Sequence, residues 1–317
     1  MGKYFHVNGK RLEEQYVSHL SDFFEWEQFD HASDWVLFPD NIGEYLSIDE
    51  TSLSQGELYT VLTNKQAGGK KGSLVAMIKG TESEYVTSIL KKISKSKRNK
   101  VKEVTLDMAS SMQKIVRTCF PKSQQVTDRF HVQKLAYDAL QQLRIEHRWN
   151  AIDQENKEIE VCREFNKPFH PNKLDNGDTM KQLLARSRYL LFKSEENWTP
   201  SQVARSEILF RYFPDIEQAY NLCRELGAIY HKTNQKGVAF TKLARWYDKV
   251  EKAEFKSFRI IAQTIQNNYL TILNYFDNRS TNASAESFNA KIKAFRAQFR
   301  GVRNIPFFLY RLSKIYA

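Results

Sequence analysis

The chain has 317 residues, of which 41% are hydrophobic and 27% are charged. Such a composition excludes a disordered chain and provides for one large or two ordinary domains with a buried core. The 48 basic residues outnumber the 37 acidic ones, and the net charge of +11 favours a polyanionic partner such as nucleic acid.

Cysteine spacing and apolar runs narrow the class of protein further. Cys119, Cys162 and Cys223 are widely spaced and form no Cys-x-x-Cys pair, which argues against a zinc ribbon and against a disulfide framework. Residues 1–9 carry no signal peptide, and no apolar run approaches the roughly 18 residues of a membrane span. We therefore expect a cytoplasmic protein without a membrane partner.

Residues 1–43 mix aromatic and acidic side chains, and their structure is unclear from the sequence. From Glu44 onwards the pattern becomes regular. It predicts three short strands separated by turn-rich segments, at roughly 44–49, 57–63 and 73–79. Their close spacing indicates an antiparallel meander.

Three helices and two more strands are predicted next. Thr81 is expected to cap the first helix, whose apolar stripe is Tyr85, Ile89 and Ile93. Strand 103–107, a helix stopped by Pro121, strand 125–128 and a helix starting near His131 complete the series. The order βββαβαβα is that of the RNase H-like fold, in which the first strand is central and the fourth runs beside it. We therefore predict an α/β fold with a mixed five-stranded sheet.

Residues 140–280 show helical patterns and almost no strand signal. Thr199 and Pro200 mark a helix start, and one continuous apolar stripe runs from Phe255 to Phe276. Trp149, Trp198 and Trp246 are expected in the core, with base stacking as the alternative. We predict four parts: an N-terminal segment, a first catalytic part, an all-helical insertion and a C-terminal catalytic helix, spanning 1–43, 44–140, 141–280 and 281–317.

Three acidic residues at the edges of apolar elements form the candidate site. Asp49 ends the first strand, Asp107 ends the fourth, and Glu286 opens the last amphipathic helix. Carboxylates brought together in this way repel one another unless divalent cations lie between them, and two-metal sites of this kind cut and join phosphodiesters. Each residue alone is also explained as the polar end of a strand or helix, but their placement favours the functional interpretation.

The helix that begins at Glu286 carries two more candidates. Asn289 and Lys293 lie three and seven residues later and share one helix face with Glu286. A carboxylate for metal, an amide and a cation for phosphate suit a DNA-cutting site. The competing interpretation is a surface helix whose polar face has no function.

Further candidates are less specific. Asp128 ends the fifth strand, His131 either caps the next helix or accepts protons, and Arg129 either reaches phosphate or pairs with Asp128. Charge runs are often only solvated faces, but six more basic side chains join Arg129 as candidates for contact with the DNA backbone. They are Lys70, Lys71, Lys291, Lys293, Arg296 and Arg300.

At this point the sequence resembles a known family. Four segments are similar to the catalytic blocks of bacterial insertion-sequence transposases of the DDE type, namely 47–51, 106–109, 126–132 and 281–293. Their order and context match over roughly 44–315. The resemblance implies a retroviral-integrase-like core with a helical insertion, Mg²⁺ or Mn²⁺ as cofactor with two ions per site, and cleavage and joining of DNA at element ends. We expect Asp49 to bridge both ions, with Asp107 on one and Glu286 on the other.

The resemblance also implies partners. Transposon-end DNA and target DNA are the expected substrates, and paired ends call for at least a homodimer. Family members usually carry an N-terminal zinc ribbon and helix-turn-helix, whereas this chain starts almost directly at the expected core. We therefore expect either a separate DNA-binding protein or a truncated copy. Two other classes stay open: a nuclease or resolvase that cuts without joining, and a non-enzymatic DNA-binding protein.

Overall fold

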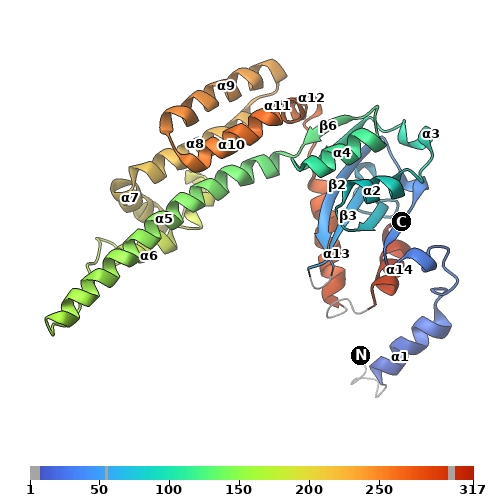
Figure 1. Ribbon diagram of the computed structural model, residues 1–317, viewed down its shortest axis with the longest axis horizontal. Coiled ribbons are helices and arrows are strands. Elements are labelled where there is room, and N and C mark those ends of the chain that lie inside the picture. Colours follow the sequence, from blue (N-terminus) through green and yellow to red (C-terminus); the bar gives the residue numbers. More distant parts are fainter. Residues whose placement is uncertain (1–7, 54–55, 299–303) are drawn as a thin grey trace. The chain divides into compact units, whose positions relative to one another are not determined.

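The computed structural model describes residues 8–53, 56–298 and 304–317. The chain forms two compact units (Figure 1). An α/β unit comprises residues 1–128 and 279–317, and a helical unit comprises residues 129–278. The helical unit is therefore inserted between two parts of the α/β unit.

A mixed sheet forms the centre of the α/β unit. Within the described residues it has six strands in the order β1-β4-β3-β2-β5-β6. The strands are β1 (Trp35–Leu37), β2 (Tyr45–Ser52), β3 (Leu58–Asn64), β4 (Leu74–Lys79), β5 (Glu103–Leu106) and β6 (Gln124–Thr127). The helices of this unit are α1 (Gly9–Gln15), α2 (Ser83–Leu90), α3 (Lys95–Arg98), α4 (Ser110–Cys119), α13 (Ala283–Gln298) and α14 (Ile305–Tyr316).

Strand pairing follows the order expected from the sequence. Strands β2, β3 and β4 form an antiparallel meander, which confirms that prediction. Strand β5 pairs with β2 in parallel, and β6 pairs with β5 in parallel. The predicted pairing of the strand that carries Asp49 with the strand that precedes Asp107 is therefore confirmed.

The expectation of five strands was wrong, because residues 1–43 contribute a sixth. Strand β1 pairs with β4 antiparallel, with Trp35 opposite Ile78 and Leu37 opposite Ala76. Its three residues are too few to show the alternation by which a strand is recognised in a sequence. The strand is stabilised by its tertiary pairing partner rather than by a local pattern.

Helices cover both faces of the sheet (Figure 1). Strand residues such as Leu46 and Ile48 pack with α2 and α4 on one face. On the other face, Val61 and its neighbours pack with Phe288 and Ile292 of α13 and with α14. Full burial of such a side chain contributes about 1.5–3 kcal/mol, so this packing fixes α13 on the sheet.

Helix α2 differs in detail from its prediction. It begins at Ser83 after Glu82, so Thr81 is not its cap. Val86 is fully buried whereas Tyr85 is 37% exposed, so Tyr85 does not belong to the stripe. The stripe instead continues through Ile89, which is buried as expected.

The helical unit consists, in its described residues, of helices with longer connections at 165–179 and 187–199 and short ones elsewhere. They are α5 (Arg129–Glu164), α6 (Met180–Arg186), α7 (Pro200–Tyr212), α8 (Pro214–Lys232), α9 (Lys236–Ala253), α10 (Lys256–Asn267), α11 (Tyr269–Leu273) and α12 (Tyr275–Asn278). Thr199 and Gln202 form a capping box before Pro200, which confirms the predicted helix start. Trp246 is fully buried as expected, whereas Trp149 is 59% exposed, and its prediction as a core residue was wrong.

The single long helix expected from Phe255 to Phe276 is divided into α10, α11 and α12. At Asn268 the backbone leaves helical geometry, with φ −111° and ψ 13°. The Asn268 side chain donates to the carbonyl oxygen of Thr264 at 2.8 Å, and such local side-chain bonds compete with a helix. Tyr269 is consequently 41% exposed, although the apolar spacing predicts it inward.

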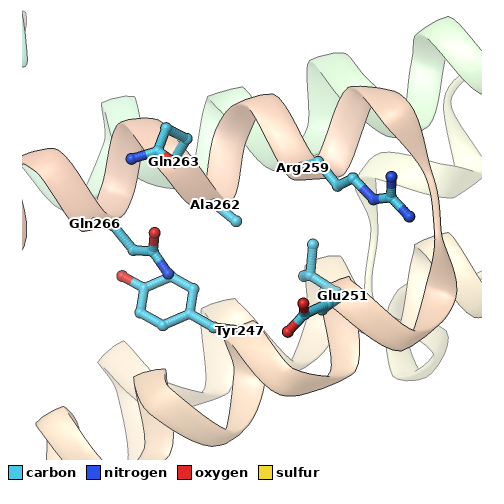
Figure 2. Close-up of a pocket in the computed structure, with 7 residues that line it drawn as sticks. Tyr247, Glu251, Arg259, Ala262, Gln263 and Gln266 are labelled. Atoms are coloured by element: carbon cyan, nitrogen blue, oxygen red, sulfur yellow. The ribbon is translucent and has the colours of Figure 1, made fainter.

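Helices α9 and α10 leave a hollow of about 430 Å³ between them (Figure 2). Figure 2 shows Tyr247 and Glu251 of α9 facing Arg259 and Gln266 of α10. Burial raises the pKa of Tyr247 to about 12, so the phenol stays protonated at neutral pH.

No helix in the described part of the chain is both long and apolar enough to cross a bilayer.

Candidate active site

Three aspartates lie just beyond the paired parts of the parallel strands. Asp107 and Asp128 follow the last residues of β5 and β6. The expectation that Asp49 ends its strand was wrong, because β2 continues to Ser52 in its antiparallel pairing with β3. Ser47 of β2 is in register with Thr105 of β5, and Thr105 is in register with Val126 of β6. Two residues further along each strand come Asp49, Asp107 and Asp128. Because neighbouring strands lie about 4.8 Å apart, matching register places these aspartates side by side along one sheet edge.

Asp49 is held by a residue 240 positions away in the chain. The Asn289 amide of α13 donates to Asp49 Oδ2 at 2.7 Å. The other carboxylate oxygen, Oδ1, accepts the backbone N–H of Glu50 at 2.9 Å. These two bonds fix the orientation of Asp49, which is half-buried.

Asp107 lies just past β5, in the turn that leads into α4. Its Oδ1 accepts the backbone N–H of Ala109 at 2.8 Å, a local bond typical of aspartate in turns. The side chain is half-buried. The end of β5 and the start of α4 therefore orient this carboxylate.

Glu50 adds a further carboxylate next to Asp49 on β2. Burial raises the pKa of Glu50, and the negative charges of Asp107 and then Asp49 raise it further. Alternation along β2 points Glu50 to the face opposite Asp49, but its carboxyl still lies within electrostatic range of both aspartates. The adjacency of Glu50 to Asp49 was the signal available in the sequence.

Glu286 lies in the first turn of α13, on the exposed side of the helix. Its backbone N–H donates to the carbonyl oxygen of Asn282 at 2.9 Å. Asn289, which contacts Asp49, lies three residues later on the same stripe, roughly 4.5 Å further along the helix axis. Phe288 and Ile292 pack the helix onto the sheet.

The acidic side chains differ in how they are brought together. Asp49 and Asp107 lie on paired strands, whereas Glu286 comes from a helix packed over them. In residues 8–53, 56–298 and 304–317, no group of three or more His, Cys, Asp or Glu side chains is close enough to hold a metal ion.

Asp128 belongs to the α/β unit, whereas Arg129 and His131 belong to the helical unit. Asp128 is 2% exposed, and its Oδ1 accepts the backbone N–H of Asn282 at 3.3 Å. Arg129 and His131 belong to α5 in the helical unit. Arg129 donates to the hydroxyl of Tyr275 at 3.5 Å, and His131 is half-buried.

The basic candidates also separate into groups. Lys70, Lys71 and Lys293 are exposed, and Arg296 is half-buried. Lys291 instead donates to the carbonyl oxygen of Gly69 at 2.6 Å and lies 5.9 Å from the centre of the Tyr316 ring. Its ammonium group thus joins α13 to the β3–β4 turn. Arg300 lies outside the described residues.

The similarity to known proteins covers the part of the chain that contains Asp49, Asp107 and Glu286. The family model of the ISL3 group of DDE transposases, described as a transposase, matches residues 46–312. The chain is also similar to the transposase for insertion sequence element IS1001 of Bordetella parapertussis, with 20% identity over 272 residues. That alignment covers 85% of this chain and 60% of the relative.

Proposed function

Since the chain belongs to the ISL3 family of DDE transposases, we propose that it cuts the ends of a transposon and transfers the resulting 3′-hydroxyl to target DNA. We further propose that the α/β unit is a retroviral-integrase-like RNase H core. The observation that carries this proposal is the hydrogen bond from Asn289 to Asp49. It attaches the helix of Glu286 to the strand of Asp49, beside the strand that precedes Asp107.

The donor chemistry of the candidate residues suits a hard divalent cation, although the described part of the chain does not gather three such side chains closely enough to hold one. Asp49, Asp107 and Glu286 offer carboxylate oxygens, the ligands that Mg²⁺ and Mn²⁺ prefer. Burial is the main cause of the raised pKa of Glu50, and the negative charges of Asp107 and Asp49 add to it, so a bound cation would offset part of the effect. We propose that these three side chains hold two ions. When bound, such ions stabilise charge on the phosphate and lower the pKa of water.

The residues around these carboxylates prepare the site. Asn289 and the Ala109 N–H fix the orientations of Asp49 and Asp107, so little reorganisation is needed when DNA binds. Lys293, which is exposed one turn after Asn289, is placed to contact the DNA backbone. Hydrolysis and strand transfer are both displacements at phosphorus, so one site serves both reactions without a covalent protein–DNA intermediate.

An end-cleavage assay on DNA that carries the element ends, in the presence of Mg²⁺, tests the proposal. Asp49→Asn, Asp107→Asn and Glu286→Gln should each abolish cleavage, because each removes a charged ligand, while circular dichroism remains that of the folded chain. Ser287→Ala is the matched control, because Ser287 is exposed on the same helix. Retained cutting in any one acidic variant would remove that residue from the site.

Strand transfer with pre-cut ends separates the proposed function from the other classes. A transposase joins a pre-cut 3′-hydroxyl to target DNA, whereas a resolvase-like nuclease cuts without joining. A non-enzymatic DNA-binding protein would neither nick nor join DNA in Mg²⁺. Each result is read directly from labelled DNA on a denaturing gel.

We also propose that two copies of the chain assemble when two element ends are paired. The chain spans about 60% of the length of the transposase to which it is similar. Recognition of the element ends by a separate DNA-binding protein is a further part of the proposal. Sedimentation of the purified chain with end DNA should yield a complex with two protein copies. A complex with one copy would contradict the dimer.

A further inference from the structure

Two charged side chains that flank strands of the sheet, Asp128 and Lys65, contact the segment 280–282, which leads into α13. Asp128, at the end of β6, is 2% exposed. Lys65, in the turn after β3, has a side chain that is 14% exposed. Burying a charge is costly unless it is paired or hydrogen-bonded, so the contacts of these two groups require an explanation.

Asp128 is connected to Glu286 through the backbone of a single residue, Asn282. Its Oδ1 accepts the N–H of Asn282 at 3.3 Å, and the carbonyl oxygen of Asn282 accepts the N–H of Glu286 at 2.9 Å. Asn282 itself is fully buried. A negative charge is also favourable at a helix N-terminus, because the helix dipole is positive there. The Asp128 carboxylate therefore stabilises the first turn of α13 through its hydrogen bond to Asn282.

Lys65 contacts Ser280, which lies two positions before Asn282. Its ammonium donates to Glu103 Oε1 at 3.1 Å, to Thr105 Oγ1 at 2.7 Å and to the hydroxyl of Ser280. These contacts use all three donors of the ammonium group. Glu103 and Thr105 belong to β5, so Ser280 is tied to the strand that leads to Asp107.

From these contacts, and resting on the proposed function, we propose that Asp128 and Lys65 are positioning residues that set the location of Glu286 relative to Asp49 and Asp107. Both act on the segment where the chain enters α13, and both are attached to strands that end at the sheet carboxylates. A displacement of about 1 Å in a reacting group can lower a rate by about 10²-fold. The start of α13 is therefore the place where a small shift would have the largest effect on Glu286.

A positioning role of Asp128 can be distinguished from a direct role of its charge in the reaction. The second oxygen, Oδ2, is buried and has no hydrogen-bond partner in the described part of the chain. Asp128→Asn keeps an oxygen that can accept the Asn282 N–H but removes the charge, whereas Asp128→Ala removes both. A positioning role needs the acceptor, and a direct role needs the charge.

The first test measures end cleavage at saturating DNA together with DNA affinity. Asp128→Ala should lower kcat by about 10²-fold with unchanged Kd for end DNA, because Glu286 is displaced while the DNA surface is intact. Asp128→Asn should restore kcat to within about threefold of the wild type, because the hydrogen-bond acceptor remains. If Asp128→Asn is as inactive as Asp128→Ala, the charge itself is required and the positioning proposal is overturned.

The second test reports on α13 without any reaction. Hydrogen exchange of residues 280–290 in the full chain should be faster in Asp128→Ala than in the wild type, and near normal in Asp128→Asn. The paired variant Lys65→Met with Glu103→Gln tests the other anchor without leaving a buried charge unpaired, and it should also speed exchange there. Asp178→Ala is the control, because Asp178 is 1% exposed and pairs with Arg186 and Arg205 in the helical unit.

The two tests fail in different ways. If exchange at the start of α13 is unchanged in Asp128→Ala and in the Lys65 variant, the positioning proposal is overturned, even when Glu286 is essential. If Asp178→Ala speeds exchange at 280–290 as much as Asp128→Ala, the effect is general loss of stability, which also overturns it. If instead Glu286→Gln still cleaves, the proposed site is wrong while the exchange result stands.

Discussion

Asn289 shows how one side chain can join two distant parts of a site. It lies on a helix that is packed by Phe288 and Ile292, and its amide reaches the Asp49 carboxylate at 2.7 Å. An amide donor leaves the charge of the carboxylate in place while fixing its orientation. Partners of this kind around a metal ligand are usually important for activity, although they do not touch the metal.

We expect Asn289→Ala to lower end cleavage by about 10–100-fold, because Asp49 loses the donor that orients it. Thermal stability and the affinity for end DNA should stay near the wild-type values. Cleavage kinetics and a DNA-binding titration measure the two effects, with Ser287→Ala on the same helix as control. Wild-type cleavage in Asn289→Ala would show that the hydrogen bond has no role in the reaction.

Lys291 and Lys293 are two residues apart on α13 but have different surroundings. Lys291 is bound to Gly69 and Tyr316, whereas Lys293 is exposed. Lys291→Met should lower the free energy of unfolding by about 1–2 kcal/mol, because a charged hydrogen bond is lost. Lys293→Ala should change the free energy of unfolding by less than about 0.5 kcal/mol.

The same pair of variants separates the two roles in DNA binding. Lys293→Ala should reduce the salt dependence of DNA affinity by about 0.9 in the slope of log K against log salt, as expected for one lost phosphate contact. Lys291→Met should leave that slope unchanged. Urea unfolding and binding titrations at several salt concentrations measure both, and the reverse pattern would exchange the two assignments.

At the scale of elements, helix α14 is attached to the segment that precedes β1. Phe23 packs between Phe307 and Tyr310 in a small aromatic cluster. Asp22 accepts hydrogen bonds from Tyr310 and, at 2.7 Å, from Lys314. These two bonds lower the pKa of Asp22 from 3.8 to about 2.

The lowered pKa of Asp22 makes the free energy of unfolding depend on pH. A carboxyl whose pKa is lowered by folding stabilises the fold above its unfolded pKa of 3.8, and this contribution is lost as pH falls towards about 2. Asp22→Asn should therefore be less stable than the wild type at pH 6. The difference should shrink between pH 4 and pH 2. Urea unfolding across this range measures it, and a difference that is constant with pH would contradict the ionic origin.

At the scale of the whole molecule, the chain leaves the α/β unit after Asp128 and re-enters it at Arg279. Asp128 Oδ1 lies 3.3 Å from the backbone nitrogen of Asn282, so the exit and the return are close together. The helical unit has a buried core of its own, which includes Trp246, Tyr220 and Leu226. Close ends and separate cores are the usual conditions under which an inserted domain is tolerated.

We expect that replacement of residues 129–278 by a short Gly/Ser linker leaves a folded α/β unit, because the linker has only a short gap to span. The helical unit, residues 129–278, should fold separately with a helical circular dichroism spectrum. Cooperative thermal unfolding of each piece measures this. Loss of cooperative unfolding in either piece would show that the two units depend on each other for stability.

Local patterns in the sequence were sufficient for the order of strands and helices in the α/β unit. Short strand-like runs between turn-rich segments predict the meander of β2, β3 and β4, and the order βββαβαβα predicts that β5 lies beside β2. Strand β1 and the break at Asn268 were not predictable in this way. A three-residue strand has no periodicity, and the break depends on a side-chain bond within the helix itself.

The amino-acid sequence alone therefore determined the helix that carries Glu286, Asn289 and Lys293 on one stripe, the strand that contains Asp49 and the strand that ends before Asp107. Only the tertiary structure decided what these side chains contact. The bond from Asn289 to Asp49 and the attachment of Lys291 to Gly69 join residues more than 200 positions apart. Periodicity reports which face of an element is buried, but the partner on that face depends on how the layers pack.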